Sequence, residues 1–64
     1  MNLIPNLIFS MGDRKFVIDT VWNKKDDRTI EFHEVGKEGK TIVRKESFMK
    51  MQELKFEGIK KEEK

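Results

Sequence analysis

The sequence predicts a small, mostly β domain, and three observations indicate this fold class. The apolar residues are rich in Ile, Val and Phe, with few Leu and no Ala. β-branched and aromatic residues favour strands, whereas Ala and Leu are the strongest helix formers. Residues 29–35 and 40–45 alternate apolar and polar side chains on either side of a short connection that glycines bracket. A chain of 64 residues without cysteine must also fold around one small apolar core, because no disulfide stabilises it.

Residues 1–11 are predicted to form an apolar N-terminal arm in front of the β domain. The apolar residues of the arm recur at a spacing that a short helix would gather on one face: Leu3, Ile4, Leu7 and Ile8. Pro5 fits a first helical turn or an edge strand, so both conformations stay open. The β domain, residues 12–59, begins at the turn that Gly12 and Asp13 predict.

The centre of the chain is predicted to form three consecutive strands. Residues 15–22 are the first, and this strand is apolar on both sides of its pleat. A polar turn at 23–28 leads into the second strand, 29–35. The second strand pairs with the third, 40–45, as a hairpin across the connection 36–39.

The predicted register places Val35 opposite Lys40 and Phe32 opposite Val43 in the hairpin. Trp22 of the first strand is aligned with Ile30 of the second. Because side chains alternate between the two faces of a sheet, this alignment gathers one set of residues on the core face: Phe16, Ile18, Trp22, Ile30, Phe32, Thr41 and Val43. A one-residue slip would exchange the faces, so the register decides which residues are buried.

The C-terminal part has two interpretations. Residues 46–51 are predicted to form one short helical or 3₁₀ turn that Ser47 caps, and residues 53–59 then alternate as a last strand. The alternative is a helix over 47–61, which would give a three-stranded meander followed by a C-terminal helix.

The end of the chain, residues 60–64, has no apolar residue and is predicted to be a disordered charged tail.

This order of elements resembles that of SH3-like small barrels. The segment "IFSMGDRKFVI" is similar to the hydrophobic-x-x-Gly-Asp start of several such barrels, including KOW-type modules and small prophage-encoded proteins. The matching residues are Phe9, Gly12, Asp13, Phe16 and Ile18. The resemblance implies a single SH3-like or open β-barrel of about four to five strands with one short helical turn. It does not extend to polyproline recognition, because the chain has no Tyr for an aromatic groove.

The sequence predicts no catalytic, cofactor or metal site. The chain has one histidine and no cysteine, and neither Ser10 nor Ser47 lies in a nucleophile-elbow motif. One histidine with scattered carboxylates does not match zinc spacing. "GKEGKT" has two residues between its glycines, whereas a phosphate-binding loop needs four. We therefore expect neither an enzyme nor a small-molecule substrate.

Charge suggests nucleic acid as an alternative partner. The formal net charge is only +2, with fourteen basic and twelve acidic residues, which is typical of a highly charged solvated surface. Clustered basic residues are nevertheless candidates for phosphate contacts: Arg14, Lys15, Lys24, Lys25, Arg28, Arg44 and Lys45. The aromatic residues that would stack on bases are instead predicted to lie in the core, so nucleic acid is the second choice.

An apolar strip on the second face favours a protein partner. The predicted register leaves four residues outside the core: Val17, Val21, His33 and Ile42. A contiguous apolar strip usually marks an interface. We expect the N-terminal arm to fold back and cover this strip, and the alternative is that a partner protein or a second copy in a homodimer covers it.

The leading prediction is thus a non-enzymatic binding module, an adaptor or inhibitor that acts by protein interaction. A nucleic-acid-binding small β-barrel is the alternative. The small size and high Lys and Glu content resemble those of phage or mobile-element proteins. No run approaches the ~20 apolar residues that span a bilayer, and the N-terminus lacks the features of a signal peptide. A cytoplasmic location without membrane contact is therefore expected.

Overall fold

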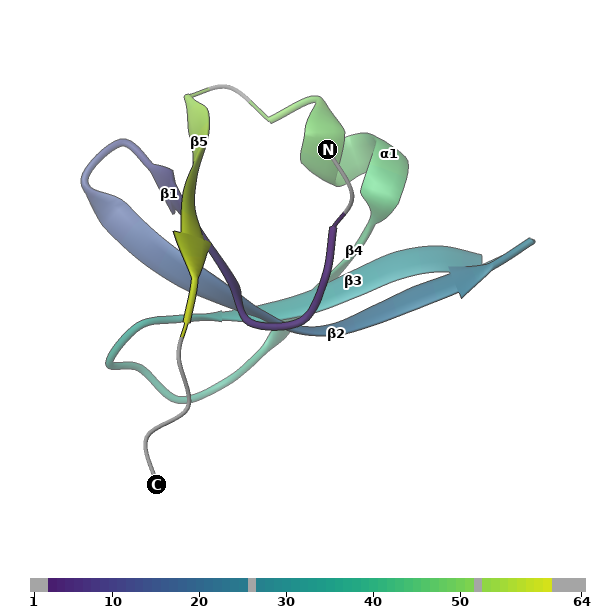
Figure 1. The fold of residues 1–64 in the computed structure, drawn as a ribbon, viewed down its shortest axis with the longest axis horizontal. Coiled ribbons are helices and arrows are strands. Elements are labelled where there is room, and N and C mark those ends of the chain that lie inside the picture. The colour runs from purple at the N-terminus through teal and green to yellow at the C-terminus, as the bar shows by residue number, and fades with distance from the viewer. Residues whose placement is uncertain (1–2, 26, 52, 61–64) are drawn as a thin grey trace.

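The computed structural model describes residues 3–25, 27–51 and 53–60 and shows five strands and one short helix (Figure 1). The elements in chain order are β1 (Leu7–Met11), β2 (Arg14–Lys24), β3 (Asp27–Glu34), β4 (Thr41–Arg44), α1 (Lys45–Met49) and β5 (Leu54–Ile59). A mostly β fold with one helical turn before the last strand is as the sequence predicts.

The five strands form one antiparallel sheet in the order β4-β3-β2-β1-β5. The sheet curves strongly, but no ladder among the placed residues joins β4 to β5, so it stays open at these two edges. Because residues Leu54–Ile59 pair with β1 as a strand, the alternative of a meander with a C-terminal helix is wrong.

Residues 7–11, which the sequence analysis placed in a separate arm, are an integral strand of the sheet. This strand, β1, lies between β2 and β5 and pairs with both. The backbone of Asn6 joins the same region: its N–H donates to the carbonyl of Ile18, and its carbonyl accepts from the N–H of Lys60. The segment therefore does not fold over the outside of the sheet.

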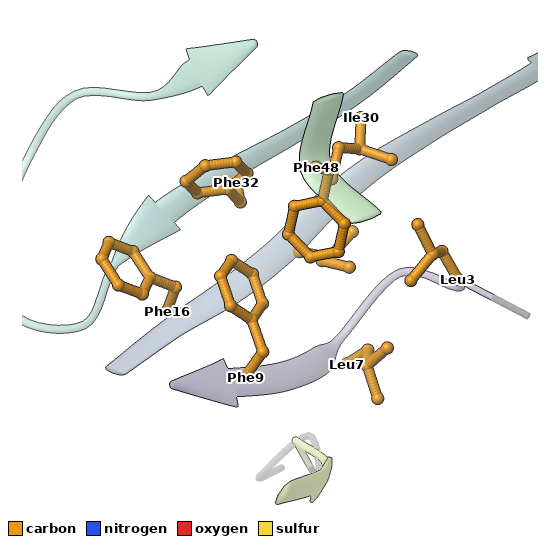
Figure 2. Close-up of a cluster of buried hydrophobic side chains, with 8 residues drawn as sticks. Leu3, Leu7, Phe9, Phe16, Ile30, Phe32 and Phe48 are labelled. Atoms are coloured by element: carbon orange, nitrogen blue, oxygen red, sulfur yellow. The ribbon is translucent and has the colours of Figure 1, made fainter. Parts of the chain in front are cut away.

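The core lies inside the curve of the sheet and is dominated by phenylalanine (Figure 2). Its buried members come from every part of the fold: Leu3, Leu7, Phe9, Phe16, Ile18, Ile30, Phe32 and Phe48. The α1 helix packs against β3 and β4 and buries Phe48 fully. Ser47 is exposed and does not cap the helix. The N-cap residue is Arg44, and its side chain forms no capping hydrogen bond.

A β-bulge in β2 changes which side chains face the core. Phe16 and Ile18 are buried as predicted. The register with β3 then shifts between Ile18 and Thr20, and one additional residue in a strand reverses the alternation that follows it. Val21, opposite Ile30, packs against the core. Trp22 therefore lies on the outer face, and its predicted place in the core is wrong.

The register of the β3–β4 hairpin differs by two residues from the prediction. Phe32 lies opposite Thr41 rather than Val43. A shift by two residues keeps every side chain on its face, and Ile30, Phe32 and Val43 accordingly face the core as predicted. The connection takes up the difference with Gly36 at φ 83° and Gly39 at φ 95°, a region that glycine enters without strain.

Among the residues that the structure places, no helix is long and apolar enough to cross a membrane.

Candidate nucleic-acid interface

The outer face of the sheet does not carry the continuous strip that the sequence predicts. Val17 and His33 are direct neighbours across β2 and β3, but Val17 is only 4% exposed. Val21 lies on the core face because of the bulge. Ile42 is 60% exposed and lies opposite Glu31, away from Val17. The structure thus brings together two of the four predicted residues.

His33 is held beside the bulge. Its Nδ1 donates a hydrogen bond of 2.7 Å to the Asp19 carboxylate, and both side chains are about one quarter exposed or less. Asp19 sits at the point where the β2–β3 register shifts. We infer that this hydrogen bond stabilises the bulge, because a bulged residue loses its regular ladder partner.

An apolar hollow of about 400 Å³ lies over the buried Val17. Its apolar lining comes from β1, from β2 and from the residue that follows β3: Ile8, Val17 and Val35. Charged groups form its rim, including Lys15, Glu57 and Lys60. Of the four residues in the predicted protein-binding strip, this hollow contains Val17 and His33.

Two of the seven predicted basic residues are neutralised by ion pairs. Arg14 forms a two-fold hydrogen-bonded pair with Glu34, in which Nε lies 3.1 Å from Oε2. The Lys15 ammonium lies 3.2 Å from the Glu57 carboxylate. Both side chains are therefore already paired with glutamate carboxylates, which makes them weak candidates for phosphate contacts.

These pairs shift the pKa of their carboxylates. The hydrogen bonds from Arg14 hold the pKa of Glu34 below its usual value, and in return raise the pKa of Arg14. A hydrogen bond with Ser10, and then the pair with Lys15, lower the pKa of Glu57. All the shifts favour the charged forms, as expected for ion pairs.

The other five predicted basic residues gather at one end of the molecule. Lys24 ends β2 and Lys25 follows it, Arg28 is the second residue of β3 and lies opposite Asn23, and Arg44 ends β4, followed by Lys45 of α1. We call these five residues, together with Lys50 behind α1, the basic end. None of its side chains forms an ion pair with another residue in the placed part of the chain.

Two hollows mark the surface of the basic end. One, of about 260 Å³, is lined by Lys25, Asp27, Arg28, Thr29, Arg44 and Glu46. The other, of about 400 Å³, is lined by Arg28, Lys45, Glu46, Met49 and Lys50. Arg28 lines both, so the two hollows are neighbours around its side chain. Cationic groups around adjoining hollows favour the binding of a polyanion.

Charge is unevenly distributed over the chain. The residues that the structure describes include twelve basic and nine acidic ones. The basic end has six of these cations, against the carboxylates of Asp27 and Glu46, which leaves six cations against seven carboxylates in the rest of the described chain. The surplus of positive charge among the described residues is therefore concentrated at one end.

Trp22 is the functional candidate that sequence reasoning missed. It is half-buried on the outer face, opposite Thr29, and it does not pack against the core cluster. Thr29 in turn lies opposite Arg44, so the indole is close to the basic end. The signal that could have located it is the position of Asp19, a polar residue that interrupts the apolar pattern where the bulge forms.

Among the residues with described positions, no group of three or more His, Cys, Asp or Glu side chains is arranged to hold a metal ion. Comparison with known proteins gives no relative: no protein-family model, no curated protein and no solved structure matches the chain. The function must therefore be inferred from the geometry of the surface.

Proposed function

We propose that this protein is a non-enzymatic binding module that binds nucleic acid through its basic end. The observation that carries the proposal is the set of cations that converge from β2, β3, β4 and α1 without an ion-pair partner in the placed chain. Holding like charges together costs free energy, which the negative charge of a bound polyanion offsets. The counterions that a nucleic acid releases on binding favour the complex further. The sequence alone favoured a protein partner, but the bulge divides the apolar strip on which that preference depended.

The proposed fold is an open relative of the SH3-like small barrels, including the KOW-type modules. The strand order β4-β3-β2-β1-β5 and the helical turn between β4 and β5 support this assignment. The Gly12-Asp13 turn also supports it, because Gly12 takes a φ of 64° between β1 and β2.

The test is the salt dependence of binding to a fluorescently labelled oligonucleotide. Replacing Lys24, Lys25 and Arg28 by Gln should weaken binding at ~50 mM salt and reduce the slope of log K against log salt by up to about three phosphate contacts. The matched control replaces three cations outside the basic end by Gln: Lys37, Lys40 and Lys55. It removes the same charge and should leave the slope unchanged. Equal slopes for the two triple variants would exclude the basic end, and no binding by the unmodified protein would exclude the function.

A second candidate function is protein interaction at the hollow over Val17, and its apolar lining is the observation that favours it. The simplest occupant is a second copy of the chain. Val35 is 54% exposed beside the hollow, so Val35→Asp should leave the fold intact. If the hollow is a dimer interface, sedimentation equilibrium should show a dimer for the unmodified chain and a monomer for the variant. A monomeric unmodified chain would exclude the homodimer.

A further inference from the structure

The outer face presents one row of side chains that joins the indole to the basic end. Trp22, Thr29 and Arg44 are successive partners across β2, β3 and β4. Their neighbours Val21, Ile30 and Val43 form the matching row on the core face, which fixes the outward direction of the first three. Neighbouring strands lie about 4.8 Å apart, so the backbones of Trp22 and Arg44 are about 10 Å apart, within reach of an arginine side chain.

Lys24 and Arg44 lie on the face of this row, whereas Arg28 lies one position from Thr29 and borders the row from the side of α1. Lys24 follows Trp22 by two positions on the same strand and therefore points to the same side. Arg28 and Arg44 line the hollow of about 260 Å³ to which Thr29 also contributes. Two carboxylates on β3 lie two positions from Thr29 on the same face. Asp27 accepts a hydrogen bond of 2.6 Å from Thr29 Oγ1 and lies opposite Lys24. Glu31 accepts a hydrogen bond from Thr20 and lies 3.9 Å from the Lys40 ammonium. The negative charge beside the indole is thus partly compensated by the protein itself.

An aromatic ring among cations distinguishes single strands from duplexes. In a duplex each base is stacked between its neighbours, so an indole on a sheet surface has no free base face to contact. A single strand can place a base on the ring while its phosphates lie on the surrounding cations.

We propose that the basic end is a single-strand site in which one base stacks on Trp22 and the flanking phosphates contact Lys24, Arg28 and Arg44. This proposal rests on the proposed function and specifies its ligand. The class of ligand is single-stranded nucleic acid, RNA or DNA, because stacking and phosphate contact are common to both.

The experiment uses the chain's only tryptophan as the probe. Titration of the full chain with a dT12 oligonucleotide, with rU12 and with a 12-base-pair duplex is followed by tryptophan fluorescence. Stacking should quench the emission saturably with the single strands, and the duplex should quench little and bind more weakly. A difference between dT12 and rU12 tells which single strand is preferred.

Two variants separate stacking from charge, with binding measured by the anisotropy of a labelled oligonucleotide. Trp22→Leu should lose about 5- to 150-fold in affinity for the single strands, the range that corresponds to the about 1–3 kcal/mol of one stacked base. Trp22→Phe should retain most of the affinity, and circular dichroism checks that both variants are folded. Duplex binding should change little in either variant.

The outcomes distinguish this inference from the proposed function. Equal affinity of single strands and duplex, or unchanged single-strand affinity in a folded Trp22→Leu variant, would overturn the stacking site and leave a charge-based nucleic-acid binder. Absence of binding to all three probes at ~50 mM salt would overturn both.

Discussion

Phe9 is fully buried, with its ring centroid 4.9 Å from that of Phe48 and 5.2 Å from those of Phe16 and Phe32. It contacts Phe48 and Phe32 edge to face and stacks on Phe16, two arrangements that aromatic pairs prefer. A single ring thus connects β1, β2, β3 and α1. In a domain of this size, such a residue holds a large share of the total stability.

We therefore predict that Phe9→Ala destabilises the protein by about 3–5 kcal/mol, the usual cost of removing a buried phenylalanine ring. Phe32→Ala, at 4% exposure, should have a cost of the same size. Ile42→Ala is the control, because Ile42 is 60% exposed and should change the free energy of unfolding by at most about 0.5 kcal/mol. Urea unfolding followed by circular dichroism measures all three. A Phe9→Ala variant as stable as the control would contradict the packing in Figure 2.

Individual core residues were largely predictable wherever alternation is regular. Phe16, Ile18, Ile30 and Phe32 are buried as expected from the alternation of their strands. Phe9 was not expected in the core, because the Leu and Ile spacing in the first eight residues also fits a helix. The alternation of Leu7, Phe9 and Met11 just before the Gly12 turn was the better signal, since all three face the core.

At the scale of elements, the turns decide how the strands meet. Gly12 joins β1 to β2 with a φ of 64°, in the left-handed region. A Cβ atom at this position would lie 3.5 Å from Glu53 Oε2, which is an ordinary contact. Any cost of substitution would thus come from the backbone conformation rather than from crowding.

We predict that Gly12→Ala destabilises the protein by about 1–2 kcal/mol, the cost of the left-handed region for an alanine. Gly12→Asn should recover part of this loss, because asparagine tolerates the same region. Thermal unfolding of the two variants against the unmodified chain tests the order. If Ala and Asn cost the same, the turn conformation is not the reason for the glycine.

The order of the elements after Gly12 followed from the sequence, but the registers of their strands and the place of residues 7–11 in the sheet did not. Both hairpin strands, the helical turn and the last strand lie close to their predicted positions. The bulge near Asp19 was missed, because a single additional residue leaves no mark in composition or charge. That one residue places Val21 on the core face and Trp22 on the outer face. The outer face thereby loses a residue of the predicted protein-binding strip and gains an aromatic residue that can stack on a base. The basic residues were identified individually, but only the fold shows that Arg14 and Lys15 are paired and the others are gathered.

At the scale of the whole molecule, the two ends differ in how charge is held. Toward β5 and the β3–β4 connection, cations are paired with carboxylates, as in Lys15 with Glu57 and Arg14 with Glu34. At the basic end no such pair is present among the residues placed in the structure. Acid should therefore affect the first region and leave the cations of the second unchanged.

We predict that the thermal midpoint falls as the pH drops below about 4.5, the ordinary pKa of a glutamate. The pKa values of Glu34 and Glu57 are lowered in the folded state, so their stabilisation is complete above that pH and is lost as the pH falls through the folded values. The double variant Glu34→Gln, Glu57→Gln should have a lower midpoint at pH 7 and a smaller further fall between pH ~5 and ~3.

Glu38→Gln is the control for this measurement, because Glu38 is exposed and forms no ion pair with another placed residue. The thermal midpoint of this variant should fall with pH as much as that of the unmodified chain. A double variant with the same fall as the unmodified chain would place the acid-sensitive groups elsewhere.

The bulge in β2 has a consequence for recognising related genes. The direction of each side chain after Ile18 depends on the one additional residue of the bulge. Its deletion would leave the composition almost unchanged and turn Trp22 inward. A relative without a bulge here must carry its aromatic residue one position away to present it on the same side. An alignment that places a gap freely in this region would pair residues from opposite faces. Homologues that share the proposed ligand are thus better sought by the distance from bulge to aromatic residue than by overall identity.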